Sequence, residues 1–119
     1  MTKNTRELGI SGELKAGKYL EDEGYKILER NYRCRYGEID IIAAKSNTLC
    51  FIEVKTRTTG SFLQPEESVD RFKLSHIKNC ANHYIQQNNM EEYDVSFDVI
   101  SIISNKTRMS LKHVRNCDI

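Results

Sequence analysis

The chain has 119 residues, of which 18 are Lys or Arg and 17 are Asp or Glu, so its formal net charge at pH 7 is +1. This length corresponds to one ordinary domain, residues 1–119, with a single core. No apolar stretch is long enough to cross a bilayer, and the polar residues 1–6 lack the hydrophobic region of a secretory signal. We therefore expect a cytoplasmic protein that does not enter a membrane.

The first half of the chain predicts one helix followed by three strands. Residues 5–23 have small and apolar side chains at helical spacing, and Gly24 follows them as a helix stop. Strand-like segments come next, at residues 25–33, 37–45 and 48–57. The links between these segments are very short, which favours an antiparallel meander.

The second half predicts one more helix and two strands. A loop that contains Gly60 and Pro65 leads into a helix over residues 66–88, and strands follow at residues 95–103 and 109–114. The long helical connection allows the fourth strand to lie parallel to the third. The expected fold is therefore α/β, a mixed central sheet flanked by helices, with the order α-β-β-β-α-β-β.

Two predicted strands contain charged residues in apolar surroundings. Glu38 and Asp40 stand among isoleucines in the second strand, and Glu53 and Lys55 flank Val54 in the third. Strand side chains alternate between faces, so we expect each charged pair to share one face. An isolated Glu-x-Lys triplet is usually a solvent face, but strands this apolar are typically covered on both sides. Buried carboxylates need compensation, for which a metal ion or a fixed ammonium group is usual.

Glu13 is a further acidic candidate, located in the predicted first helix. It shares a helix face with Gly9, Ala16 and Leu20, and so lies on or beside the buried stripe. The small residues there allow a close approach to the sheet. Glu13 is therefore either a boundary residue that extends its carboxylate to solvent or a fourth member of the acidic site.

The small net charge hides a basic surround. Without the four acidic candidates, 18 basic residues remain against 13 acidic ones, an excess of five. A basic surround with an acidic, metal-binding centre suits a phosphodiester substrate. The alternative for the cluster at residues 30–35 is a solvated basic edge strand. The candidate phosphate-binding residues are Arg30, Arg33, Arg35, Arg57 and Lys73.

The four cysteines show no C-x-x-C pair, so we expect reduced structural thiols rather than disulfides or zinc ligands. His76, Cys80 and His83 would align on one face of the second helix. No fourth ligand is evident in the sequence, which favours a packed helix face over a metal site.

The combination of Glu13, Asp40 and Glu53-Val54-Lys55 resembles the D…(D/E)-x-K constellation of the restriction-endonuclease-like nucleases. Ile39 stands where that superfamily often has a proline. More narrowly, residues 9–114 resemble the YraN family of small bacterial proteins, a predicted endonuclease family. The blocks that carry this resemblance are Gly12-Glu13, residues 24–33, Gly37-Glu38-Ile39-Asp40, residues 51–57 and Phe97-Asp98-Val99-Ile100.

The resemblance implies a nuclease that cleaves DNA with Mg²⁺ or Mn²⁺. Asp40 and Glu53 would hold the metal, Val54 would offer its backbone carbonyl, and Glu13 would complete or flank the site. Lys55 would orient or activate the attacking water. Glu38 matches the family pattern without an assigned role. Archaeal Holliday-junction resolvases have a similar layout, which implies branched or flapped DNA as substrate and allows a homodimer.

Two other functions also fit the sequence. One is a catalytically silent nucleic-acid-binding module on the same fold, and the other is an interaction or scaffold protein whose acidic residues are ordinary surface. The nuclease hypothesis requires the carboxylates of Asp40 and Glu53 to converge, with Lys55 beside them and Glu13 approaching from the first helix. If Asp40 and Glu53 lay on opposite faces of the sheet, that hypothesis would fail.

Overall fold

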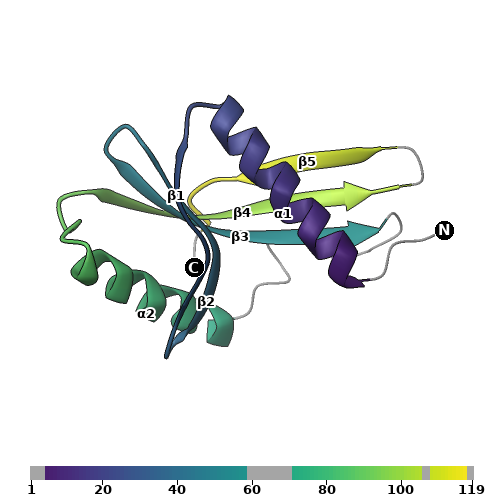
Figure 1. Cartoon of the computed structure of the whole chain (residues 1–119). Coiled ribbons are helices and arrows are strands. Elements are labelled where there is room, and N and C mark those ends of the chain that lie inside the picture. Colours follow the sequence, from purple (N-terminus) through teal and green to yellow (C-terminus); the bar gives the residue numbers. More distant parts are fainter. Residues whose placement is uncertain (1–4, 59–70, 106–107, 118–119) are drawn as a thin grey trace.

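The computed structural model describes residues 5–58, 71–105 and 108–117, with the side chains of residues 8–58, 75–105 and 108–117. These residues follow the predicted order α-β-β-β-α-β-β (Figure 1). Predicted and observed strand ends agree within one residue. The predicted helix start at 66–70 and the loop with Gly60 and Pro65 lie outside the described residues. The elements are α1 (Thr5–Asp22), β1 (Lys26–Cys34), β2 (Gly37–Lys45), β3 (Thr48–Thr58), α2 (Arg71–Gln87), β4 (Asp94–Ser104) and β5 (Met109–Val114).

The strands form one mixed sheet in the order β1-β2-β3-β4-β5. The pairs β1–β2, β2–β3 and β4–β5 are antiparallel, and β3–β4 is parallel. Both the antiparallel meander and the parallel fourth strand are thereby confirmed. The physical reason is connection length, since a short turn returns the chain antiparallel and a helical crossover is needed for a parallel neighbour.

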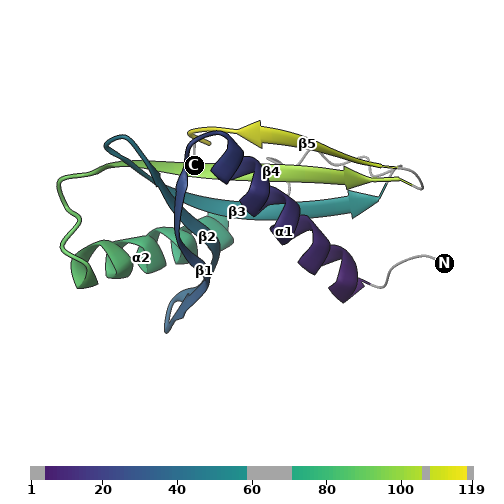
Figure 2. The same ribbon diagram turned by 45° about the horizontal axis from the view of Figure 1, so that its top comes forward.

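The two helices pack on opposite faces of the sheet, which we call the α1 side and the α2 side (Figure 2). Alternate residues of β3 divide between the two cores. Cys50 and Ile52 pack on the α1 side with Leu20, whereas Leu49 and Phe51 pack on the α2 side. This arrangement explains why residues 49–52 of β3 are all apolar, because a strand covered on both faces has no solvent side.

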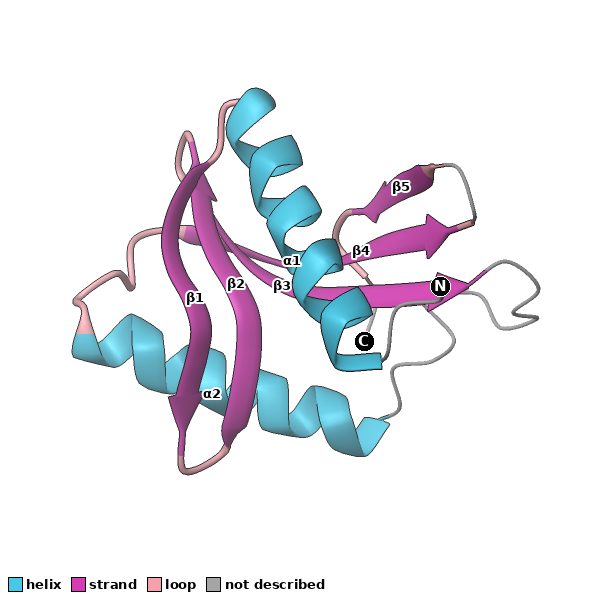
Figure 3. Cartoon of the chain, turned by 45° about the vertical axis from the view of Figure 1, so that its right-hand side comes forward, coloured by secondary structure: helices cyan, strands magenta, loops and turns pink. Residues whose placement is uncertain are grey.

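The sheet forks between β2 and β3. Their pairing runs only from Lys45↔Thr48 to Ile41↔Ile52, after which β2 continues along β1 while β3 continues along β4. Figure 3 shows the β1–β2 hairpin turned away from the far ends of β3 and β4, with α1 running between the two parts. The residues immediately beyond the last β2–β3 pair are Asp40 and Glu53.

Candidate functional site

Asp40 interrupts the regular alternation of β2. Ile39 packs in the α2-side core and Ile41 in the α1-side core, although residues two apart on a regular strand share a face. The Asp40 carboxylate Oδ2 accepts a hydrogen bond of 2.8 Å from the backbone N–H of Val54 on β3. The side chain therefore points across the fork. This differs from the simple alternation that we expected for Glu38 and Asp40.

Three more carboxylates surround Asp40. Burial and the charge of Glu53, followed by the charges of Glu13 and Glu38, raise the pKa of Asp40 to about 7, although the bond from Val54 opposes this shift. Burial raises the pKa of Glu13 as well, and the charges of Glu38 and Glu53 act in the same direction. Acidic groups from α1, β2 and β3 thus meet at the fork, and their repulsion makes that position favourable for a cation.

Glu13 reaches the fork because α1 lies very close to the sheet. The Oγ1 atom of Thr56 on β3 occupies the space that a β-carbon at Gly12 would take. One and a half turns along the helix, a β-carbon at Gly17 would collide with the guanidinium of Arg30 on β1. A side chain at Gly12 would displace Thr56, and one at Gly17 would require the flexible end of Arg30 to move. The small residues of the helix therefore do what the sequence predicted, and they bring Glu13 next to the acids of β2 and β3.

Asn31 is a member of the site that sequence reasoning missed. It stands on β1 between the paired residues Arg30 and Tyr32, and its φ of 52° is in the left-handed region, which asparagine tolerates better than most residues. The side-chain amide of Asn31 is oriented with its nitrogen toward the two carboxylates. In this orientation the nitrogen donates to Glu13 Oε1 at 3.1 Å and to Glu38 Oε1 at 3.3 Å. Asn31 therefore links α1 to β2.

Lys55 lies beside the cluster. Its Nζ atom is 3.3 Å from Glu53 Oε1, and the two side chains are only 22% and 11% exposed. Glu53 and Lys55 continue the alternation of Leu49 and Phe51 along β3, so they share one side of the strand as expected. The partial burial of this pair distinguishes it from an ordinary surface ion pair.

The donor atoms fit a hard cation, since carboxylate oxygens and a backbone carbonyl are the ligands that Mg²⁺ prefers. Among the described residues, no three or more His, Cys, Asp or Glu side chains are arranged as a ready metal cage. A full cage is not required, because Mg²⁺ typically takes one or two carboxylates and retains water. Asp40, Glu53 and the Val54 carbonyl are the candidates to hold it, with Glu13 beside them.

The predicted phosphate-binding residues are spread over the hairpin and β3. Arg30 lies against α1, where its charge partly opposes the rise in the pKa of Glu13 that burial causes. Arg33 Nε is 3.6 Å from Glu38 Oε2, so it also lies near the acidic residues. Arg35 does not, because its guanidinium stacks over the ring of Tyr36 in the β1–β2 turn. Arg57 is half-buried on β3, and the side chain of Lys73 lies outside the described residues.

Asp98 on β4 is more deeply buried than Asp40 and has the opposite environment. His113 Nε2 lies 2.7 Å from Asp98 Oδ2, while Ser96 Oγ and the backbone N–H of Asn116 donate to Oδ1. The hydrogen-bond network extends from His113 Nδ1 to the Tyr19 hydroxyl, 2.8 Å away. Burial disfavours the charge of Asp98, but these bonds outweigh it and lower the pKa of Asp98.

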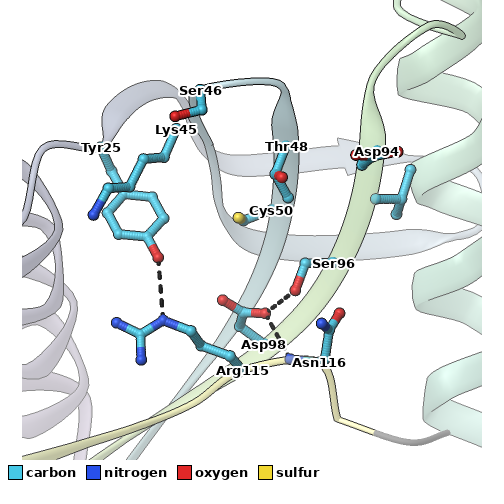
Figure 4. A pocket seen from close by; sticks show the side chains of 11 residues that line it. Tyr25, Lys45, Ser46, Thr48, Cys50, Asp94, Ser96, Asp98, Arg115 and Asn116 are labelled. Atoms are coloured by element: carbon cyan, nitrogen blue, oxygen red, sulfur yellow. Dashed lines mark hydrogen bonds between the residues drawn. The ribbon is translucent and has the colours of Figure 1, made fainter.

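Asp98 borders a polar pocket of about 650 Å³ (Figure 4). Two cations in the same lining contact Tyr25. Arg115 Nε donates to its hydroxyl at 3.4 Å, and Lys45 Nζ lies 5.0 Å from its ring centroid. Sequence reasoning missed this region. The available signal was Asp98 itself, a carboxylate inside an otherwise apolar strand.

The described helices include none with the length and apolarity needed to span a membrane.

Comparison with known proteins places the chain among uncharacterised relatives. The family described as "Uncharacterised protein family UPF0102" matches residues 12–102. A UPF0102 protein of Caldanaerobacter subterraneus subsp. tengcongensis is 42% identical over 113 residues, which cover 95% of this chain and 93% of the relative. A UPF0102 protein of Fusobacterium nucleatum subsp. nucleatum is 47% identical over 103 residues, covering 87% of each chain. One from Geobacter metallireducens is 41% identical over 116 residues, covering 98% and 95%.

Proposed function

The chain belongs to the uncharacterised protein family UPF0102, and we propose that it is a metal-dependent endonuclease that hydrolyses phosphodiester bonds in DNA. The observation that supports this function is the fork. There, burial together with the charges of Glu53, Glu13 and Glu38 raises the pKa of Asp40 to about 7, and Lys55 Nζ lies 3.3 Å from Glu53 Oε1. A chain gains no stability from gathering four carboxylates, so the cluster favours a bound cation.

Five residues at the fork have a proposed role. Asp40 and Glu53 hold Mg²⁺ or Mn²⁺ together with the Val54 carbonyl, and Glu13 completes or flanks the site. When bound, the metal would polarise the scissile phosphate and neutralise its charge. Lys55 orients the attacking water and stabilises the charge that develops on the phosphate. Its contact with Glu53 keeps the ammonium group at the site.

The DNA contacts that we propose go to the phosphate backbone. Arg30 and Arg33 lie near the acidic cluster, and the remaining candidates are Arg35, Arg57 and Lys73. Phosphate contacts carry no sequence information, so affinity should depend strongly on salt and weakly on sequence. We propose branched or flapped DNA as the preferred substrate, which rests on the resemblance to junction resolvases.

One cleavage assay tests the activity. Linear, flapped and four-way DNA are incubated with the protein while Mg²⁺ or Mn²⁺ is titrated. We expect metal-dependent cleavage that Asp40→Asn and Glu53→Gln reduce to background, whereas Lys55→Ala lowers the rate by about 10²–10³.

Asp22→Asn and Lys18→Ala are the matched controls, because these residues form an exposed pair on α1 with 3.7 Å between Lys18 Nζ and Asp22 Oδ2. Both controls should cleave like the wild type. Full cleavage by Asp40→Asn would refute the site assignment.

A silent nucleic-acid-binding module is the second candidate. It is favoured by the internal partners of the acids. The Val54 N–H donates to Asp40, Lys55 contacts Glu53, and the Asn31 amide contacts Glu13. Salt-sensitive DNA binding without cleavage at any metal concentration would establish this function instead. If neither binding nor cleavage occurs, the interaction-protein hypothesis gains support.

Symmetric cleavage of both strands of a junction needs two active sites, which a twofold dimer provides. Sedimentation of the protein with and without four-way DNA measures the stoichiometry. A dimer on the junction supports paired cleavage, whereas a monomer limits the enzyme to nicking one strand.

A further inference from the structure

Two thiols meet at the tip of the β1–β2 hairpin, on the side of the sheet away from α1. Cys34 ends β1 and Cys80 lies in the middle of α2, 46 residues later, yet their sulfur atoms are only 2.9 Å apart. All four cysteines of the chain are free thiols. A disulfide has an S–S distance of about 2.05 Å, so a movement of about 1 Å would bring the two sulfurs to bonding distance.

The surroundings hold both sulfurs in place. The backbone N–H of Tyr36 donates to Cys34 Sγ at 3.3 Å, and the Cys80 thiol lies 3.7 Å from the Gly37 carbonyl. The turn is also attached to α2 by His76, whose Nδ1 is 2.8 Å from the Tyr36 carbonyl oxygen. The contact between the thiols is therefore fixed by the fold, not by chance rotation of two loose side chains.

We propose that Cys34 and Cys80 form an oxidation site at which a low-molecular-weight disulfide such as oxidised glutathione closes an intramolecular Cys34–Cys80 disulfide. This bond would fasten the hairpin that carries Asn31, Glu38 and Asp40 to α2. The site is separate from the acidic fork and does not depend on nuclease activity.

The difference in burial sets the order of the steps. Cys34 is half-buried, whereas Cys80 is fully buried, and burial raises the pKa of the Cys80 thiol to about 12. The Cys34 thiolate attacks one sulfur of oxidised glutathione, forms a mixed disulfide and releases one glutathione. Cys80 then attacks Cys34 Sγ and gives its proton to the second glutathione, which leaves as the thiol. The protein loses two electrons and two protons, and one glutathione disulfide becomes two glutathione thiols.

Counting thiols in the full chain tests the proposal. The protein is reduced, freed of metal with EDTA, incubated with oxidised glutathione and alkylated after denaturation. We expect two alkylated cysteines in place of four, and a non-reduced peptide map that joins Cys34 to Cys80. Four alkylated thiols, a lasting glutathione adduct on Cys34 or a bond to Cys117 would each overturn the proposal.

Cysteine-to-serine variants and the melting temperature provide a second test of the proposal. Cys34→Ser and Cys80→Ser should lose the bond, and the control Cys117→Ser should keep it, because the Cys117 thiol faces the Val114 carbonyl instead. Oxidation should raise the melting temperature of the wild type by about 5–15 °C, reversibly with dithiothreitol, since the bond closes a long loop. A disulfide that leaves the melting temperature unchanged or lowers it would show that the contact must distort to close, and would contradict its role as a fastener.

Discussion

Asp40 and Asp98 lie on the two strands that flank β3, the first half-buried and the second buried, and their environments are opposite. Asp98 accepts hydrogen bonds from Ser96 and Asn116 and contacts His113, so its pKa falls below the ordinary value. Asp40 receives one backbone hydrogen bond, and its burial together with the carboxylates of Glu53, Glu13 and Glu38 raises its pKa to about 7. Burial opposes ionisation at both positions, and the neighbouring groups decide the outcome.

The difference separates a structural carboxylate from a candidate functional one. The negative charge of Asp98 is satisfied within the chain, and removing it would leave buried donors without partners. The charge of Asp40 is opposed by its neighbours, so the folded chain would be more stable without it unless a cation binds. Poorly compensated charge in a defined position is typical of functional sites.

The largest expected effect on stability is at Asp98. Asp98→Ala should lower the free energy of unfolding by about 3–5 kcal/mol, because His113 Nε2, the Ser96 hydroxyl and the Asn116 N–H lose their carboxylate partner. Asp40→Ala should change it by less than about 1 kcal/mol or increase it. Urea denaturation of both variants measures the contrast. Asp98→Asn is the control for shape, since it retains the side-chain volume and should cost less than Asp98→Ala. Equal losses for the two alanine variants would remove the distinction between the aspartates.

A change of pH in the presence of EDTA should have an intermediate effect on the stability of the protein. The folded-state pKa of Asp40, about 7, exceeds its ordinary value of 3.8, so the folded state binds more protons than the unfolded state between these values. Stability should therefore fall as pH rises from about 4 to 7, by about 1–3 kcal/mol from this residue. Asp98 acts oppositely, because its lowered pKa contributes stability that is lost only as pH falls below 4.

Thermal denaturation between pH 4 and pH 8 measures this dependence. Asp40→Asn should flatten the decline, whereas Asp22→Asn, at an exposed position, should follow the wild type. A decline that Asp40→Asn leaves unchanged would assign the pH dependence to other groups.

The smallest expected effect is stabilisation by Mg²⁺. At tenfold excess over its dissociation constant, the ion should add about 1.4 kcal/mol to the free energy of unfolding. The gain should disappear with EDTA and in Asp40→Asn, and persist in Asp98→Asn. If Asp40→Asn retained the full gain, the bound ion would lie elsewhere on the protein.

Local sequence patterns determined the elements, their order and most of the acidic candidates. Apolar runs located the strands, short links and one long crossover predicted the sheet topology, and Gly24 ended α1 with a positive φ of 94°. These features depend on residues close together in the chain, so propensity and spacing suffice. The same patterns singled out Asp40, Glu53 and Lys55, because charge is unusual in strands covered on both faces.

Only the tertiary structure decided which groups meet. The break in alternation at Asp40 arises where β2 leaves β3, and no period-two rule predicts where two strands part. Asn31 joins Glu13 and Glu38, the Tyr19 hydroxyl finds His113 at a separation of 94 residues, and Cys34 meets Cys80 at a separation of 46. Hydrogen bonds, charge effects and sulfur contacts act over a few ångströms of space, so they depend on how the chain is folded and not on distance along it.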